Sequence, residues 1–214
     1  MISSTPMQPI SLNVPHRVYG MVSSGNCHKV KLALDILHIP YRWHETDIMK
    51  GESRTPEFLR MNPNGRVPLL QIDANTYLPE SNAILCYLAD GSDLWPGDRL
   101  ARAQALQWLF FEQYSHEPYI AVARFLHVFL KRHDDARLPD IMKRGHAALG
   151  VMETHLSQHE FFVAKRLTIA DIALFAYTHR AADGGFDLAP YPAIRAWVAR
   201  CLQQPGVTEM PTPP

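Results

Sequence analysis

The first half of the chain alternates short apolar runs of strand length with segments of helical period. The expected strands are compact β-branched or aromatic runs, whereas the helices repeat apolar residues three and four positions apart. The strand-like runs lie at 16–22, 41–46, 67–72 and 77–78, and the helix-like ones at 26–37, 55–61 and 80–89. The predicted order is therefore strand, helix, strand, helix, strand, strand, helix.

After a break rich in glycine and aspartate at 91–98, only helical periodicity remains. Helical segments are expected at 100–130, 135–159, 168–177 and 190–202. The third of these is almost entirely apolar, as a central buried helix is. Thr168 and Asp171 at its start have the spacing of a capping box. The pattern predicts an α/β domain followed by an all-α domain.

Composition narrows the possible functions. The chain has 21 basic and 21 acidic residues, so no net charge favours nucleic acid. No apolar run reaches the roughly 18–20 residues that a membrane span needs. Three well-separated cysteines form no disulfide framework, which fits a reducing, cytoplasmic location. His155 and His159 have metal-ligand spacing but no third ligand nearby, so no metal is expected.

Residues 65–82 predict a site for a small peptide. The Val67-Pro68 bond can be cis, and a proline there leaves main-chain groups of Val67 free to pair with an extended ligand. Glu80 and Ser81 stand at a predicted helix start, where free N–H groups bind anions.

Four segments carry a family resemblance: SSGNCHKVKLAL at 23–34, GESRTPEFLRMNPNGRVPLL at 51–70, ESNAILCYLA at 80–89 and LTIADIALFAY at 167–177. Together they resemble the cytosolic glutathione transferases over roughly residues 16–205. The resemblance implies a thioredoxin-like glutathione-binding domain at 16–90, a linker at 91–98 and an all-helical domain at 99–205. Residues 1–15 and 206–214 fall outside it and are expected to be a flexible extension and a flexible tail.

The resemblance implies that Ser24 is catalytic and stabilises the glutathione thiolate, with the amide of Asn26 as a second donor. The alternative for each is an ordinary helix N-cap. Cys27 is a possible reactive thiol, as in the bacterial beta-class enzymes, or else a small residue facing the sheet. Cys86 and Cys201 are expected in the core.

The resemblance also implies the glutathione contacts. Glu80 and Ser81 would hold the γ-glutamyl end, and the backbone of Val67 the cysteinyl part. Arg54 is a candidate for the glycyl carboxylate, although it can equally be a solvated charge. Arg66 flanks the proline beside Val67 and is a further glutathione-binding candidate, whose side-chain role the sequence leaves open.

The helical half should supply the pocket for a small hydrophobic electrophile. Candidates are Tyr114, His116 and Tyr119, around a proline expected to kink the helix, with ordinary buried side chains as the alternative.

The leading hypothesis is a homodimeric glutathione transferase that uses glutathione as co-substrate and needs no further cofactor. One alternative is glutathione-dependent reduction of disulfides or peroxides at the same site. Another is a non-catalytic glutathione-binding regulator, and a third is a scaffold that binds no glutathione.

Overall fold

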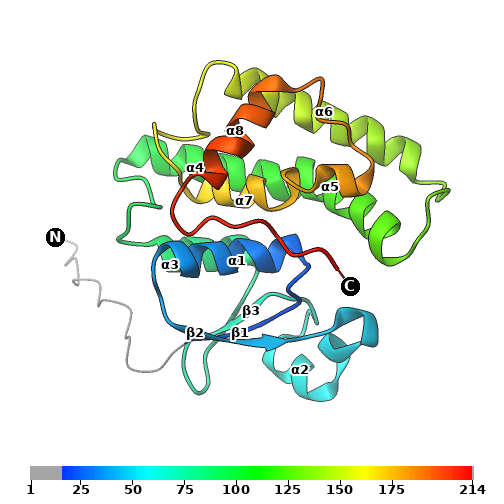
Figure 1. The fold of residues 1–214 in the computed structure, drawn as a ribbon. Helices are drawn as coiled ribbons and strands as arrows, with labels where there is room; N and C mark the ends of the chain where they lie inside the picture. Colours follow the sequence, from blue (N-terminus) through cyan, green and yellow to red (C-terminus); the bar gives the residue numbers. More distant parts are fainter. Residues whose placement is uncertain (1–15, 214) are drawn as a thin grey trace.

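The structure, a computed structural model, describes residues 16–213 and contains a small sheet domain beneath a helical domain (Figure 1). The strands are β1 (His16–Gly20), β2 (Tyr41–Glu45), β3 (Leu69–Gln71) and β4 (Tyr77–Pro79). The helices are α1 (Gly25–Ile36), α2 (Pro56–Met61), α3 (Ser81–Ala89), α4 (Arg99–Phe111), α5 (Glu117–Arg124), α6 (Leu138–Leu156), α7 (Ile169–Thr178) and α8 (Pro192–Leu202).

The sheet has the order β2-β1-β3-β4. β1 pairs parallel with β2 through the α1 crossover, and β3 pairs antiparallel with both β1 and β4. This is the expected βαβαββα arrangement, so the predicted thioredoxin-like fold is confirmed. α1 and α3 cover the face toward the helical domain, and α2 lies on the opposite side of the sheet (Figure 1).

One hydrophobic core continues from the sheet into the helical domain. It joins Val18 of β1 and Val30 of α1 to α7, all of whose residues are buried. A smaller cluster of Tyr19, Phe58 and Leu69 fixes α2 beneath the sheet. The predicted capping box is present at the start of α7: Thr168 N donates to Asp171 Oδ2 at 2.9 Å. Burial of apolar surface therefore ties the two domains into a single unit.

The long helix expected at 100–130 is interrupted twice. Two π-helical segments, Glu112–His116 and Phe125–Phe129, flank α5, and Pro118 lies in the first turn of α5. A π-helical turn takes an extra residue and changes which side chains face inward. This change of phase decides which residues reach the cleft described below.

The C-terminal segment differs from the flexible tail expected at 206–214. Within the described residues it crosses beside α1 and α7 (Figure 1), and Met210 is 1% exposed. His28 bonds to the carbonyl of Thr208 at 2.9 Å, and Met210 N donates to His179 Nε2 at 3.0 Å. A buried methionine and two histidine contacts hold this segment in place. The extension expected at 1–15 lies outside the described residues.

Candidate functional site

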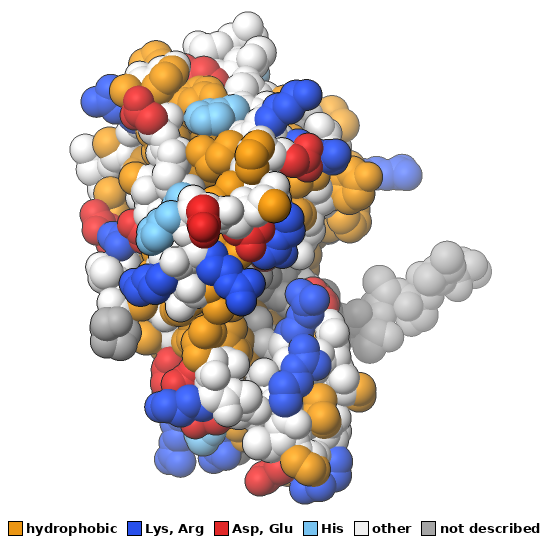
Figure 2. All heavy atoms as spheres, turned by 90° about the vertical axis from the view of Figure 1, so that its right-hand side faces the viewer, with side chains coloured by type: hydrophobic (Ala, Val, Ile, Leu, Met, Phe, Trp, Pro, Cys, Tyr) orange, Lys and Arg blue, Asp and Glu red, His pale blue; other side chains and the backbone are white. Residues whose placement is uncertain are grey.

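A cleft of about 690 Å³ opens between the two domains. Its lower wall comes from the turn after β1, the loops before and after α2, and the start of α3. Its upper wall comes from the segment 113–129 and from α7. Basic side chains gather across the middle of the face drawn in Figure 2. The lining residues that the argument uses are Ser24, Asn26, Arg54, Arg66, Val67, Glu80, Ser81, Glu117, Arg124, Phe125, Phe129 and Tyr177.

Ser24 occupies the N-cap position of α1, with φ −89° and ψ 127°, but its side chain makes no capping hydrogen bond. The Ser24 backbone N–H is instead held by the carbonyl of Met21 at 2.9 Å. The residue is half-buried and lines the cleft. Its hydroxyl group therefore stands at the positive end of a helix without being used to close that helix. The simpler reading of Ser24 as a side-chain N-cap is not what the structure shows.

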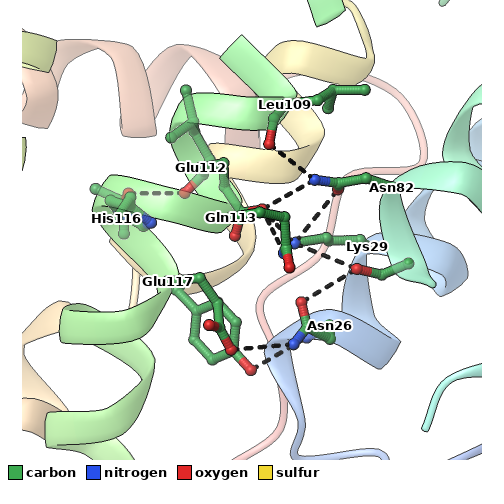
Figure 3. Close-up of polar contacts among 12 residues, drawn as sticks. Asn26, Lys29, Asn82, Leu109, Glu112, Gln113, His116 and Glu117 are labelled. Atoms are coloured by element: carbon green, nitrogen blue, oxygen red, sulfur yellow. Dashed lines mark hydrogen bonds and ion pairs between the residues drawn. The ribbon is translucent and has the colours of Figure 1, made fainter. Parts of the chain in front are cut away.

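Asn26 connects three parts of the site (Figure 3). Its backbone N–H donates to the hydroxyl of Tyr177 at 3.3 Å, and its side-chain Nδ2 donates to Glu117 Oε1 at 3.3 Å. Its Oδ1 accepts from Ser81 Oγ at 3.2 Å. The amide thus links the α1 turn to the start of α3 and to the helical domain, which fixes its orientation.

Glu80 and Ser81 form the junction between β4 and α3. Glu80 has φ 70° and ψ 110°, a region that a residue with a Cβ rarely adopts. Its side chain caps nothing and is exposed along the cleft. Ser81 is 5% exposed, and its hydroxyl donates to Asn26 rather than capping the helix that it begins. Such strain is retained mainly at functional sites, and here Glu80 and the N-terminus of α3 both line the cleft.

The turn before β3 offers unpaired main-chain groups. The Val67-Pro68 bond is cis, and β3 begins only at Leu69. Within residues 16–213, neither the N–H nor the C=O of Val67 makes a hydrogen bond. Asn62 Nδ2 holds the neighbouring carbonyl of Arg66 at 2.9 Å. The backbone of Val67 is consequently free to pair with an extended ligand in the cleft.

Two arginines flank this turn. Arg54 Nη1 donates to the carbonyl of Asn64 at 3.0 Å and lies against Gly65, whose φ is +61°. The Arg66 side chain is exposed and forms no ion pair within the described residues. Both arginines line the cleft and give this part of its wall positive charge.

The comparisons with known proteins agree with this geometry. Family models for the glutathione S-transferase N-terminal and C-terminal domains match residues 23–90 and 135–200. Glutathione S-transferase 2 of Anopheles gambiae is 33% identical over 86% of this chain and 90% of its own. The chain belongs to the glutathione S-transferase family.

Solved structures of other glutathione S-transferases extend the comparison. A glutathione S-transferase from Pseudomonas fluorescens superposes with a TM-score of 0.89 at 49% identity, covering 92% of this chain and 99% of that one. The glutathione transferase URE2P6 of Phanerochaete chrysosporium, solved with oxidized glutathione, gives 0.81 at 29% identity, covering 92% and 94%. The whole two-domain arrangement is thus that of the family.

The cleft of this glutathione S-transferase includes residues that the sequence did not single out. Gln113, Glu117, Ala121, Phe125 and Phe129 line it at intervals of four. In a regular α-helix of 3.6 residues per turn, positions spaced by four drift around the axis. The two π-helical segments bring these residues onto one face, and the sequence did not reveal those segments. Arg124 of α5 and Tyr177 of α7 also line the cleft, and their only local signal is a polar side chain within an apolar run.

The three predicted electrophile-pocket residues do not line the cleft. Tyr114 is 84% exposed on the outer surface. His116 is fully buried and bonds the Thr178 hydroxyl at 2.9 Å, and the Tyr119 hydroxyl accepts from Arg144 at 3.3 Å. The π-helical segment Glu112–His116 shifts the helix phase, so Gln113 and Glu117 face the cleft instead. These assignments were wrong because the sequence predicted a kink at Pro118 but not the π-helical segment that decides which side chains face the cleft.

Cys27 is not placed to act as a thiol in the cleft. It is 0% exposed, and burial raises its pKa to about 12. Its Sγ faces Gly20 of β1, where an added Cβ would lie 3.1 Å away. A thiol with this pKa is protonated at neutral pH and cannot act as a nucleophile. The structure supports the alternative, in which Cys27 packs against the sheet.

His155 and His159 hold main-chain carbonyls rather than facing an open site. His155 bonds the carbonyl of Phe162 at 3.1 Å, and His159 bonds that of His155 at 2.9 Å. Among residues 16–213 no group of three or more His, Cys, Asp or Glu side chains is arranged to hold a metal ion. In the same range, every helix is too short or too polar to cross a membrane.

Proposed function

We propose that this protein binds reduced glutathione along the lower wall of the cleft. The ligand's γ-glutamyl ammonium pairs with Glu80, and its α-carboxylate accepts hydrogen bonds at the N-terminus of α3 beside Ser81. Its cysteinyl backbone pairs with Val67 and its glycyl carboxylate extends toward Arg54 and Arg66. The free main-chain groups of Val67 and the strained Glu80 support this placement.

The proposed chemistry begins with the sulfur at Ser24. The single observation that carries it is that Ser24 lines the cleft at the start of α1 while its side chain makes no cap bond. A free thiol titrates near ~8.5, and lowering that pKa by about two units requires ~2.7 kcal/mol. One charge-assisted hydrogen bond contributes about 1.5–3 kcal/mol, and the helix dipole adds to it.

In the proposed reaction the bound thiolate attacks an electrophilic carbon of a hydrophobic second substrate. A carbon–sulfur bond forms, and the leaving group departs with the electron pair of the bond that breaks. The face of Ala121, Phe125 and Phe129 supports an apolar second substrate opposite Ser24.

A second candidate is reduction of a glutathione-containing disulfide at the same site. It is favoured by Asn26, whose amide is fixed two residues after Ser24, and by the relative solved with oxidized glutathione. Here the thiolate attacks one sulfur of the disulfide and expels the other as a thiolate.

Two measurements test the proposal. Calorimetric titration with glutathione should show binding by the wild type and weaker binding by Glu80→Gln. Turnover is then compared between an aryl chloride and a mixed glutathione disulfide. Activity on the aryl chloride supports transfer, and activity on the disulfide alone selects the reductase. Binding without either turnover, unchanged in Ser24→Ala, would instead indicate a regulator.

A homodimer is also part of the proposal. Phe110 and Tyr114 lie one helical turn apart on the outer face of α4 and the π-helical segment, and they are 70% and 84% exposed. Apolar side chains of this size, exposed together, mark interaction surfaces. A second copy of the chain is the proposed occupant.

A further inference from the structure

Arg124, the last residue of α5, is a buried guanidinium in the wall of the cleft. Its side chain is 2% exposed, and it is one of the cleft-lining residues. Nε donates to Asp183 Oδ2 at 3.1 Å, and Nη1 donates to the carbonyl of Ser23 at 2.9 Å. The second contact places the positive charge one residue away from Ser24.

The third nitrogen group of Arg124 has no partner. Nη2 is buried and makes no hydrogen bond to any described residue. An unsatisfied buried donor on a charged group is unfavourable, and native proteins keep such groups mainly where a function uses them. An anionic ligand group would satisfy it.

The charged side chains around Arg124 include more positive than negative groups, which favours binding of an anion. Asp183 Oδ2 accepts from Arg180 Nε at 3.0 Å as well as from Arg124, so two guanidinium groups share one carboxylate. Arg180 is 19% exposed and partly hydrated, whereas Arg124 is not. Glu117, the acidic group of the same helix that lines the cleft, is engaged by Asn26. Arg124, Arg180 and Asp183 together therefore carry a net positive charge beside the cleft.

The surroundings of this charge are apolar and aromatic. The Arg124 guanidinium carbon lies 5.5 Å from the centroid of the Phe129 ring. Phe129 itself stacks on Phe125 at 5.5 Å, and both line the cleft with Val122. A ligand that fills this part of the cleft must offer a planar apolar body and an acidic group.

We propose that Arg124 is an anion-binding residue for the second substrate, and that this substrate is a planar, apolar molecule carrying a carboxylate. The proposal rests on the proposed function, because it assumes that the glutathione sulfur lies at Ser24. It adds the substrate class: an aromatic carboxylic acid with its reactive carbon turned toward Ser24 and its carboxylate toward Arg124 Nη2.

Binding of two product analogues tests this without requiring turnover. The probes are S-benzylglutathione and S-(4-carboxybenzyl)glutathione, titrated calorimetrically into wild type, Arg124→Gln and Arg180→Gln. Wild type should bind the carboxylated analogue about tenfold tighter or better, as a charge-assisted hydrogen bond allows. Arg124→Gln should bind the two analogues equally. Arg180→Gln is the matched control: it removes the other partner of Asp183 and should keep the preference.

Equal affinity of wild type for the two probes overturns the proposal, and that comparison needs no variant. A preference that persists in Arg124→Gln overturns it as well. If Arg124→Gln does not fold, Arg124→Gln combined with Asp183→Asn avoids leaving an unpaired carboxylate. Failure of the proposed function is a different outcome, because neither S-benzylglutathione nor glutathione would then bind at all.

Discussion

At the scale of single residues, Tyr177 brings a hydroxyl group from α7 to the first turn of α1. Gly25 makes the approach possible, since a Cβ there would lie 2.5 Å from the tyrosine ring. Burial raises the pKa of Tyr177, so its hydroxyl stays neutral and can accept the Asn26 N–H. The position of the Ser24–Asn26 turn thus depends on the helical domain.

Tyr177→Phe should keep the ring packing and remove only this acceptor. We expect the free energy of unfolding to fall by about 1 kcal/mol, as for a lost hydrogen bond, with glutathione affinity largely retained. The kcat/KM for the second substrate should fall, because the turn that holds the sulfur loosens. Tyr191→Phe is the matched control: its hydroxyl bonds His146, and Tyr191 is not a cleft-lining residue. Equal kinetics for the two variants would rule out a positioning role.

The sequence could indicate Ser24, Val67, Glu80 and Ser81, because each lies next to the end of a predicted strand or helix within a short recognisable segment. It could not indicate Tyr177 or Arg124, whose contacts with this turn span 151 and 101 residues. These long-range contacts depend on how the two domains pack, and the local sequence pattern does not predict that packing.

At the scale of elements, a buried ion pair fastens α1 to the helical domain. Lys29 Nζ lies 2.7 Å from Glu112 Oε2, and both side chains are 0% exposed. Asn82 Nδ2 of α3 donates to the same carboxylate oxygen at 3.1 Å (Figure 3). The sequence indicated these helices but not the pair, because Glu112 begins a π-helical segment that helical periodicity does not reveal.

Lys29→Met should be strongly destabilising, because it leaves the Glu112 charge buried and unpaired. We expect a loss of about 3–5 kcal/mol in the free energy of unfolding. The double variant Lys29→Met/Glu112→Leu should recover much of that loss, since no buried charge remains. Urea denaturation of the four proteins of this double-mutant cycle measures the coupling. Additive losses would show that the pair does not join the two domains energetically.

At the scale of the whole molecule, two histidines secure the C-terminal segment while neutral. Burial lowers the pKa of both His28 and His179 to about 4. His179 Nδ1 bonds the carbonyl of Phe175 at 2.7 Å, so Nε2 is the acceptor for Met210 N–H. A proton added at Nε2 would face that N–H group and break the contact.

The free energy of unfolding should therefore decrease as the pH is lowered. Each histidine binds a proton near pH 6.5 when unfolded but only near pH 4 when folded, so this contribution is complete above 6.5 and is lost toward 4. The largest slope is about 1.4 kcal/mol per pH unit for each histidine. His179→Gln keeps a hydrogen-bond acceptor that does not titrate. Its free energy of unfolding, measured by urea denaturation at a series of pH values, should depend less steeply on pH than that of the wild type. Identical slopes would exclude His179 as a source.

A single carboxylate introduced on the outer face at Phe110 or Tyr114 tests the proposed dimer. Phe110→Glu and Tyr114→Glu should each shift the protein toward monomer in sedimentation velocity, because a buried unpaired carboxylate opposes association. Met49→Glu is the control, since Met49 is also an exposed large apolar residue, at 47%, but lies on the other domain. Wild type that sediments as a monomer contradicts the proposal.

The most direct test of the central claim is the pKa of glutathione's thiol when it is bound. Ultraviolet thiolate absorbance is titrated against pH for wild type, Ser24→Ala and Cys27→Ala, each saturated with glutathione. The account predicts a wild-type pKa about two units below the free value near ~8.5, a return toward that value in Ser24→Ala, and no change in Cys27→Ala. An unshifted thiol in wild type, or a lowered pKa that survives in Ser24→Ala, would contradict it.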